Sequence, residues 1–249
     1  MSYLVALDDG HGMGTPGKRT PVIPELGRSI RENEFNRAVV KLLDAELKRC
    51  GFRTLLVAPT DDDTPLSTRT NRANAAKADI YVSVHYNAGG GSGIETYHFP
   101  GSSKGRKLAQ CIHKHVKGGT PQRDRGVKSA NFHVLRETKM PAVLVEYGFM
   151  DDPGLIEARR MLDPSFQKEC AVETAKGICE YFGVPYKSGT AFPSIKPPMY
   201  DIYINDDDKD IYSTAYQDKL ISKIKELVEK GTDTIHLYRR DSKRNPKNK

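Results

Sequence analysis

Residues 3–12 read YLVALDDGHG, and this stretch decides the fold. The apolar run Tyr3–Leu7 is short and meets two aspartates and glycine-rich sequence almost at once. A short apolar run bounded by such turn residues is typical of a buried strand. We therefore expect His11 to lie in a loop directly after the carboxyl end of a central strand.

The same alternation of elements continues along most of the 249-residue chain. Apolar runs predict further strands at Phe52–Ala58, Ile80–Val84, Gly93–Phe99 and Ala142–Glu146. Helical spacing of apolar residues predicts helices at Glu32–Arg49, Leu66–Ala78, Lys104–Val116 and Ser165–Phe182. Strands that alternate with helices indicate an α/β fold, with a mostly parallel sheet covered by helices on both faces.

The sequence changes character near its end. Residues 187–198, KSGTAFPSIKPP, contain three prolines and predict a linker. Beyond it, two strands at Met199–Ile204 and Thr234–Tyr238 and an amphipathic helix over 216–228 predict a small α+β region. We expect a large domain at 1–186 and a small domain at 199–249 that binds a partner or pairs with a second copy.

Composition narrows the possible partners. Hydrophobic residues make up 37% and charged residues 29%, as in a globular protein, and the formal net charge is +7. This charge favours anionic polymers, including those of a bacterial wall, but no basic-aromatic motif points to nucleic acid. No apolar stretch approaches the ~18 residues of a membrane span. The four cysteines lack paired spacing, so we expect buried thiols in a reduced compartment.

The first residues do not resemble an export signal. The apolar run that begins the sequence meets Asp8 before a signal core could form. We therefore expect synthesis in the cytoplasm without a signal peptide.

Polar residues occupy the ends of four predicted elements. His11 and His85 follow strands, Glu146 ends a strand, and Glu32 begins the first long helix. In a parallel sheet these positions converge on one edge. Two imidazoles and a carboxylate are a common ligand set for catalytic zinc, and a second carboxylate can serve as general base. Each residue also fits a purely structural role, and Glu34 competes with Glu32.

Four motifs in order resemble the zinc-dependent N-acetylmuramoyl-L-alanine amidases of the amidase 3 type, which occur in bacterial autolysins and phage endolysins. The motifs are Asp8–Gly12, Glu32 with Asn36, Ser83–Ala88 and Pro141–Phe149. The resemblance covers about residues 3–183. Asp9 stands where the family has proline, and the loop Met13–Ile30 is longer than in the shortest members.

This resemblance implies that the chain hydrolyses peptidoglycan with zinc-activated water, between N-acetylmuramic acid and L-alanine. It implies one zinc ion held by His11, Glu32 and His85, with Glu146 as the catalytic carboxylate. We also expect Asn87 and Arg136 to contact the substrate. The domain at 1–186 would then be catalytic, and the small domain at 199–249 would bind the cell wall or pair with a second copy. Because the substrate lies outside the membrane, we expect the protein to act on the wall only after its release from the cytoplasm.

Two alternative functions also fit the sequence. A zinc carboxypeptidase of related fold would need an arginine, such as Arg136, to hold a free terminal carboxylate. A non-catalytic wall-binding module would need no metal at all.

Overall fold

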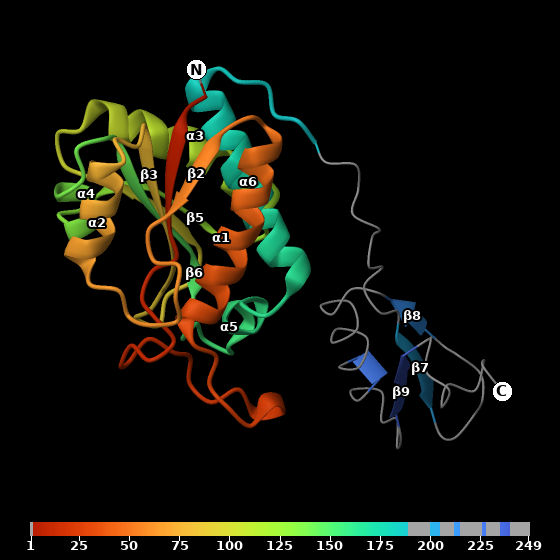
Figure 1. Cartoon of the computed structure of the whole chain (residues 1–249). Helices are drawn as coiled ribbons and strands as arrows, with labels where there is room; N and C mark the ends of the chain where they lie inside the picture. Colours follow the sequence, from red (N-terminus) through yellow and green to blue (C-terminus); the bar gives the residue numbers. More distant parts are fainter. Residues whose placement is uncertain (1, 189–199, 205–211, 215–225, 228–234, 240–249) are drawn as a thin grey trace. The chain divides into compact units, whose positions relative to one another are not determined.

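The computed structural model describes residues 2–188, 200–204, 212–214, 226–227 and 235–239 (Figure 1). The chain divides into two compact units, residues 1–187 and 188–249. Each unit is described by itself below.

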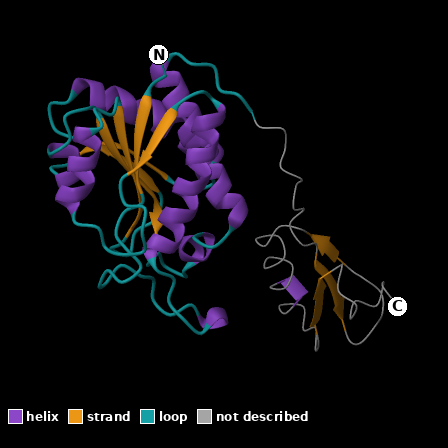
Figure 2. Ribbon diagram, in the orientation of Figure 1, coloured by secondary structure: helices purple, strands orange, loops and turns teal. Residues whose placement is uncertain are grey.

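A six-stranded sheet forms the centre of the first unit (Figure 2). Its strands are β1 (Leu4–Asp8), β2 (Arg53–Leu56), β3 (Ile80–Asn87), β4 (Ile94–His98), β5 (Asp124–Ser129) and β6 (Ala142–Phe149). The strand order is β2-β1-β3-β6-β4-β5, and only the β4–β6 pair of this sheet is antiparallel. The predicted α/β fold with a mostly parallel sheet is confirmed.

Helices cover both faces of this sheet. They are α1 (Glu32–Arg49), α2 (Leu66–Ala75), α3 (Ser103–Gly119), α4 (His133–Arg136), α5 (Ile156–Arg160) and α6 (Pro164–Phe182). The larger core joins α1, α3 and α6 to one face through residues such as Val82 and Val145. A smaller core joins α2 and α4 to the other face through Tyr81 and Leu144. Strand alternation explains why neighbouring residues enter different cores.

The helix ends carry ordinary local signals. The Ser102 side chain caps α3 by accepting a hydrogen bond from the backbone of Gly105, and Asp163 caps α6 in the same way. Gly183 ends α6 in the left-handed conformation that glycine adopts without strain. The predicted α2 was too long, because Lys77 takes a positive φ of 50° soon after the helix ends at Ala75.

Two strands extend further than expected. β3 continues to Asn87 and β6 to Phe149, because their backbones go on pairing beyond the apolar runs, with an irregularity between His85 and Asn87. His85 and Glu146 therefore lie within strands, and neither follows or ends one.

The loop 13–30 folds back on the start of α1. It contains a short 3-10 turn, η1 (Pro24–Leu26), and the backbone N–H of Glu32 donates to the carbonyl of Lys18 at 3.0 Å. Ile23 and Ile30 are buried in the larger core. The loop is thus tied to the domain by both backbone bonds and apolar contacts.

The second unit contains a three-stranded antiparallel sheet in the order β8-β7-β9. Its strands are β7 (Tyr200–Ile204), β8 (Tyr212–Thr214) and β9 (Ile235–Arg239). Two of them match predicted strands, and β8 was not anticipated. Most of the predicted helix over 216–228 lies outside the described residues, and so does most of the predicted linker.

Two expectations from composition concern the whole chain. All four cysteines are buried free thiols, as expected. Within the described ranges, the helices lack the combination of length and apolar character that crossing a bilayer requires.

Candidate metal centre

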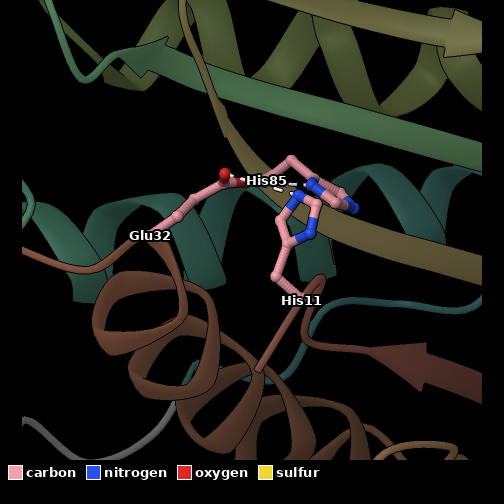
Figure 3. Close-up of side chains that lie close together, drawn as sticks. All are labelled: His11, Glu32 and His85. Atoms are coloured by element: carbon pink, nitrogen blue, oxygen red, sulfur yellow. Dashed lines mark hydrogen bonds and ion pairs between the residues drawn. The ribbon is translucent and has the colours of Figure 1, made fainter. Parts of the chain in front are cut away.

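His11, Glu32 and His85 converge at the carboxyl edge of the sheet, from the loop after β1, the start of α1 and β3 (Figure 3). Each offers one ligand atom, and these atoms lie within 4.8 Å of one another. His85 Nδ1 is 3.0 Å from Glu32 Oε1, and His11 Nε2 is 3.4 Å from Glu32 Oε2. The two imidazole rings meet edge to face, with centroids 4.9 Å apart.

The backbone at His11 is held in an unusual conformation. Its φ of 63° lies in the left-handed region, which is uncommon for a residue with a side chain. The buried amide of Asn33 donates to the carbonyls of Asp9, Gly10 and His11 at 2.6 to 3.2 Å. Arg69 donates a further bond to the His11 carbonyl at 2.7 Å. These bonds fix the loop and aim the imidazole at Glu32.

Burial sets the charge of His11. It lowers the pKa of this imidazole to about 4, although the nearby carboxylate of Glu32 acts in the opposite direction. His11 is therefore neutral at neutral pH. A neutral imidazole is the form that binds a metal ion.

Glu32 is buried, and hydrogen bonds that one of its carboxylate oxygens accepts fix its orientation. Oε1 accepts the backbone N–H of Tyr86 at 3.1 Å and the amide of Asn36 at 3.4 Å. Burial alone would raise the pKa of Glu32, but the hydrogen bond from His85 and the electrostatic interactions with both imidazoles outweigh burial, so the pKa lies below its ordinary value. Oε2 accepts no hydrogen bond among the described residues.

A second layer of residues positions His85. Its Nε2 lies 3.1 Å from the hydroxyl of Ser83, which donates to Asp8 at 2.6 Å. Asp8 in turn pairs with Arg69 at 2.6 Å, and both of these side chains are buried. A Cβ atom at Gly10 would lie within 2.7 Å of three atoms of the His85 ring, so only glycine leaves room for the imidazole.

Glu146 stands next to His85 across the sheet. The two are direct partners in the parallel β3–β6 register, so their side chains share one face. Burial raises the pKa of Glu146 to about 8, and its Oε2 has no hydrogen-bond partner among the described residues. A carboxyl with one buried, unpaired oxygen beside the three clustered residues is suited to carry a proton.

The other predicted residues lie in different surroundings. Glu34 points to Arg28, which binds its carboxylate with two bonds of 2.8 and 2.9 Å, and it does not join the cluster. Asn87 is half-buried and its amide lies 3.5 Å from Glu95. Arg136 bonds to Asn131 and Glu137 on the surface.

The topology explains the position of Arg136. β5 runs antiparallel to β6, because β4 pairs parallel with β5 and antiparallel with β6. α4 follows β5 and therefore begins at the edge of the sheet opposite His85 and Glu146. The structure does not bring Arg136 to the site.

The residues present fit a zinc ion. Two nitrogens and one carboxylate oxygen are a usual protein ligand set for catalytic zinc. Glu32 Oε2 is buried without a hydrogen-bond donor, and a metal ion would satisfy this oxygen. His11 is neutral, as a metal ligand must be.

The sequence analysis did not identify the supporting residues Arg69 and Asn33. Arg69 sits in a polar helical segment with no motif to mark it, and Asn33 lies between Glu32 and Asn36, the two residues that define the motif there.

An α/β sheet whose carboxyl edge gathers two histidines, a glutamate and a buried acid fits the class of metal-dependent hydrolases. The family model for N-acetylmuramoyl-L-alanine amidase matches residues 5–180, and the chain belongs to this family. It is therefore a peptidoglycan hydrolase, which cleaves the amide bond between N-acetylmuramic acid and L-alanine. The expected family and activity are confirmed.

Individual relatives agree with this assignment. The chain is 32% identical to the sporulation-specific N-acetylmuramoyl-L-alanine amidase of Bacillus subtilis (strain 168), over 82% of this chain and 77% of that protein. It is 38% identical to the endolysin of Bacillus phage SPP1, over 78% of this chain and 71% of the endolysin.

A solved structure supports the fold in the same way. The catalytic domain of CwlV, an N-acetylmuramoyl-L-alanine amidase from Bacillus (Paenibacillus) polymyxa var. colistinus, superposes with a TM-score of 0.65 at 33% identity. The match covers 74% of this chain and 99% of that domain.

Proposed function

We propose that His11, Glu32 and His85 hold one zinc ion and that Glu146 is the proton carrier of the amidase reaction. The observation that carries this proposal is the approach of three ligand atoms to within 4.8 Å of one another, beside a carboxyl whose Oε2 is buried and unpaired among the described residues. Zinc in such a site supplies Lewis acidity, which activates water at neutral pH.

Side chains of this protein would carry out the proton transfer and hold the metal ligands in place. The charge of a bound zinc ion would keep Glu146 ionised. Glu146 would then take a proton from the attacking water and return it to the leaving nitrogen of L-alanine, since it lies next to His85 and its Oε2 has no partner among the described residues. Ser83 and Asp8 would keep the His85 ring in one orientation through their hydrogen bonds. The bonds from Asn33 would do the same for the loop that carries His11.

The test is digestion of purified peptidoglycan by the zinc-loaded protein. We expect new N-terminal L-alanine amines and no new reducing sugars. A carboxypeptidase would instead release free amino acids from the ends of the stems. Release of reducing sugars, or of terminal amino acids alone, would contradict the proposal.

We further propose that residues 199–249 bind an anionic polymer of the cell wall. The segment 239–249 contains six basic residues and one acid, and five of the twelve tyrosines of the chain lie beyond residue 199. Aromatic side chains stack on sugars and basic ones attract phosphate-rich polymers. Pairing of two copies through this region is the competing use, and the mass of the protein in solution distinguishes the two.

A further inference from the structure

A row of acidic side chains extends from the candidate metal centre across the sheet. Glu146 on β6 is the direct partner of His85 on one side and of Glu95 on β4 on the other. Partners in register point to the same face of a sheet, and adjacent strands are about 4.8 Å apart. Glu95 is therefore the next side chain after Glu146, on the side away from His85.

Glu95 is a buried anchor for two cations. Its side chain is 2% exposed, and it accepts hydrogen bonds from four side chains. The donors are Lys128 Nζ at 2.8 Å, Asn87 Nδ2 at 3.5 Å, Arg125 Nε and the Tyr97 hydroxyl. Burial raises the pKa of Glu95, but these donors outweigh it and the pKa lies below its ordinary value, so the carboxylate stays charged.

Arg125 and Lys128 retain donors beyond those that Glu95 uses, although Arg125 Nη1 also lies 3.5 Å from the Ser92 carbonyl. Their side chains are 31% and 39% exposed, and Glu95 occupies only part of the five donors of an arginine and the three of a lysine. The Arg125 guanidinium lies 4.9 Å from the centre of the Phe149 ring, which fixes it in place. The group Glu95, Arg125 and Lys128 carries a net charge of about +1.

We propose that Arg125 and Lys128 form a subsite for the carboxylate of the second residue of the stem peptide. The inference rests on the proposed function, because it takes Glu146 as the group that protonates the leaving amine. The glycan side of the scissile bond is uncharged, since its lactyl carboxyl is part of that bond. The peptide side carries carboxylates, so two cations beside Glu146 favour the peptide.

The distances agree with this assignment. The second residue of an extended peptide lies between about 3.5 and 7 Å from the scissile nitrogen, at ~3.5 Å per residue. The cationic groups of Arg125 and Lys128 gather around Glu95, one strand or about 5 Å from Glu146. A carboxylate at this position would bind both cations without displacing Glu95.

The test compares two soluble muropeptides that differ by one carboxylate. Both carry muramic acid, L-alanine, D-glutamate and L-lysine amide, and the second-residue carboxylate is free in one and amidated in the other. We expect the wild type to prefer the free acid by about 10-fold in kcat/KM, as a charge-assisted hydrogen bond allows. Lys128→Gln should reduce this preference to about 2-fold or less, through loss on the free acid only.

Two further variants separate charge from packing. Lys128→Arg keeps a cation and should retain the preference. Lys107→Gln removes an exposed cation from α3 and should change the cleavage of neither substrate. Thermal unfolding of each variant verifies that the domain is folded.

The possible outcomes separate a failure of the proposed subsite from a failure of the proposed amidase function. If the wild type cleaves both muropeptides equally, or if Lys128→Gln slows both equally, the subsite is wrong and the amidase assignment stands. If Lys128→Gln weakens only retention on whole walls, the cations serve an anionic polymer, and the subsite is again wrong. If the wild type releases no alanine amine from either muropeptide, the proposed function itself fails.

Discussion

Arg69 and Asp8 form an ion pair of 2.6 Å in which each side chain is only 1% exposed. Asp8 also accepts the Ser83 hydroxyl, and Arg69 also donates to the His11 carbonyl. The pair therefore connects both histidines of the candidate metal centre to the buried end of β1. Removal of one partner leaves a buried charge without compensation, and the removal of both does not.

We expect Arg69→Met to lower the free energy of unfolding by about 3–5 kcal/mol. Urea unfolding followed by circular dichroism measures this change. The double variant Asp8→Asn with Arg69→Met should recover part of the loss, because it removes the stranded carboxylate. Arg72→Met on the same helix, where the side chain is exposed, should cost about 1 kcal/mol or less. Equal losses for Arg69→Met and Arg72→Met would show that the buried pair does not stabilise the fold.

Removal of a proposed zinc ligand should remove the metal. His11→Ala and Glu32→Ala should each lower the bound zinc, measured by elemental analysis, from one equivalent to a small fraction of one. Glu34→Ala is the matched control, because Glu34 binds Arg28 and does not join the cluster. A chelator should abolish activity and added zinc should restore it. Full activity in metal-stripped protein would refute a zinc mechanism.

Substitution of Glu146 should separate catalysis from metal binding. Glu146→Gln keeps the size of the side chain and removes its proton chemistry, so we expect turnover to fall by about 10²–10⁴-fold. Zinc content and thermal stability should stay close to wild type, since the carboxyl has no hydrogen-bonded partner to lose at Oε2. Loss of zinc in this variant would mean that Glu146 is a ligand.

The sequence predicts the part of the site that lies on regular elements. The apolar runs before His11 and His85 and the periodicity after Glu32 each place one side chain, and parallel strands bring such positions to one edge. The role of Arg69 could not be predicted in this way, because it depends on a contact with Asp8, 61 residues away in the sequence. No local pattern encodes a pairing of that range.

The strand β5 was not predicted, for a different reason. Its sequence, DRGVKS, is rich in charge and has a single large apolar residue, because the strand lies at the edge of the sheet and is largely half-buried. Without β5, sequence reasoning could not place Arg125 and Lys128 next to Glu95. The antiparallel β4 was predicted as a strand, but its direction depends on pairing with β6, which the hydrophobic pattern does not specify.

The start of β5 offers a test by titration. Asp124 accepts hydrogen bonds from His113 at 2.8 Å and from Lys117 at 3.2 Å, and the bond from His113 is the main cause that lowers the pKa of Asp124 to about 2. We expect NMR titration of the side-chain carboxyl to find this value, and His113→Gln to raise it towards the ordinary ~3.9.

The sign of the effect on stability follows from the lowered pKa. A carboxyl with a depressed pKa in the folded state stabilises the fold above its unfolded value of ~3.9, and this contribution disappears as the pH falls through about 2. Asp124→Asn should therefore cost stability near neutral pH and less as the pH approaches 2. Because the side chain is half exposed, we expect the cost to stay below about 1 kcal/mol. A cost that grows towards low pH would contradict this assignment.

Truncation tests the proposal that the first unit cleaves the substrate and the second binds the wall. Residues up to 187 belong to the first unit. The Tyr186 hydroxyl donates to Glu46 at 2.6 Å, and the Lys187 carbonyl accepts from Arg49 at 2.9 Å. A chain that ends at Ser188 keeps both bonds, whereas one that ends at Tyr186 loses the second.

We expect the chain that ends at Ser188 to cleave soluble muropeptides as well as the full chain does, because His11, Glu32, His85 and Glu146 all precede the cut. It should sediment less with intact walls, since the basic and tyrosine-rich segment has been removed. Added salt should weaken the sedimentation of the full chain, because an electrostatic contact with an anionic polymer is screened by ions. If both proteins sediment equally at low salt, residues 189–249 do not bind the wall. Pairing of two copies would then be tested by the mass of the full chain in solution.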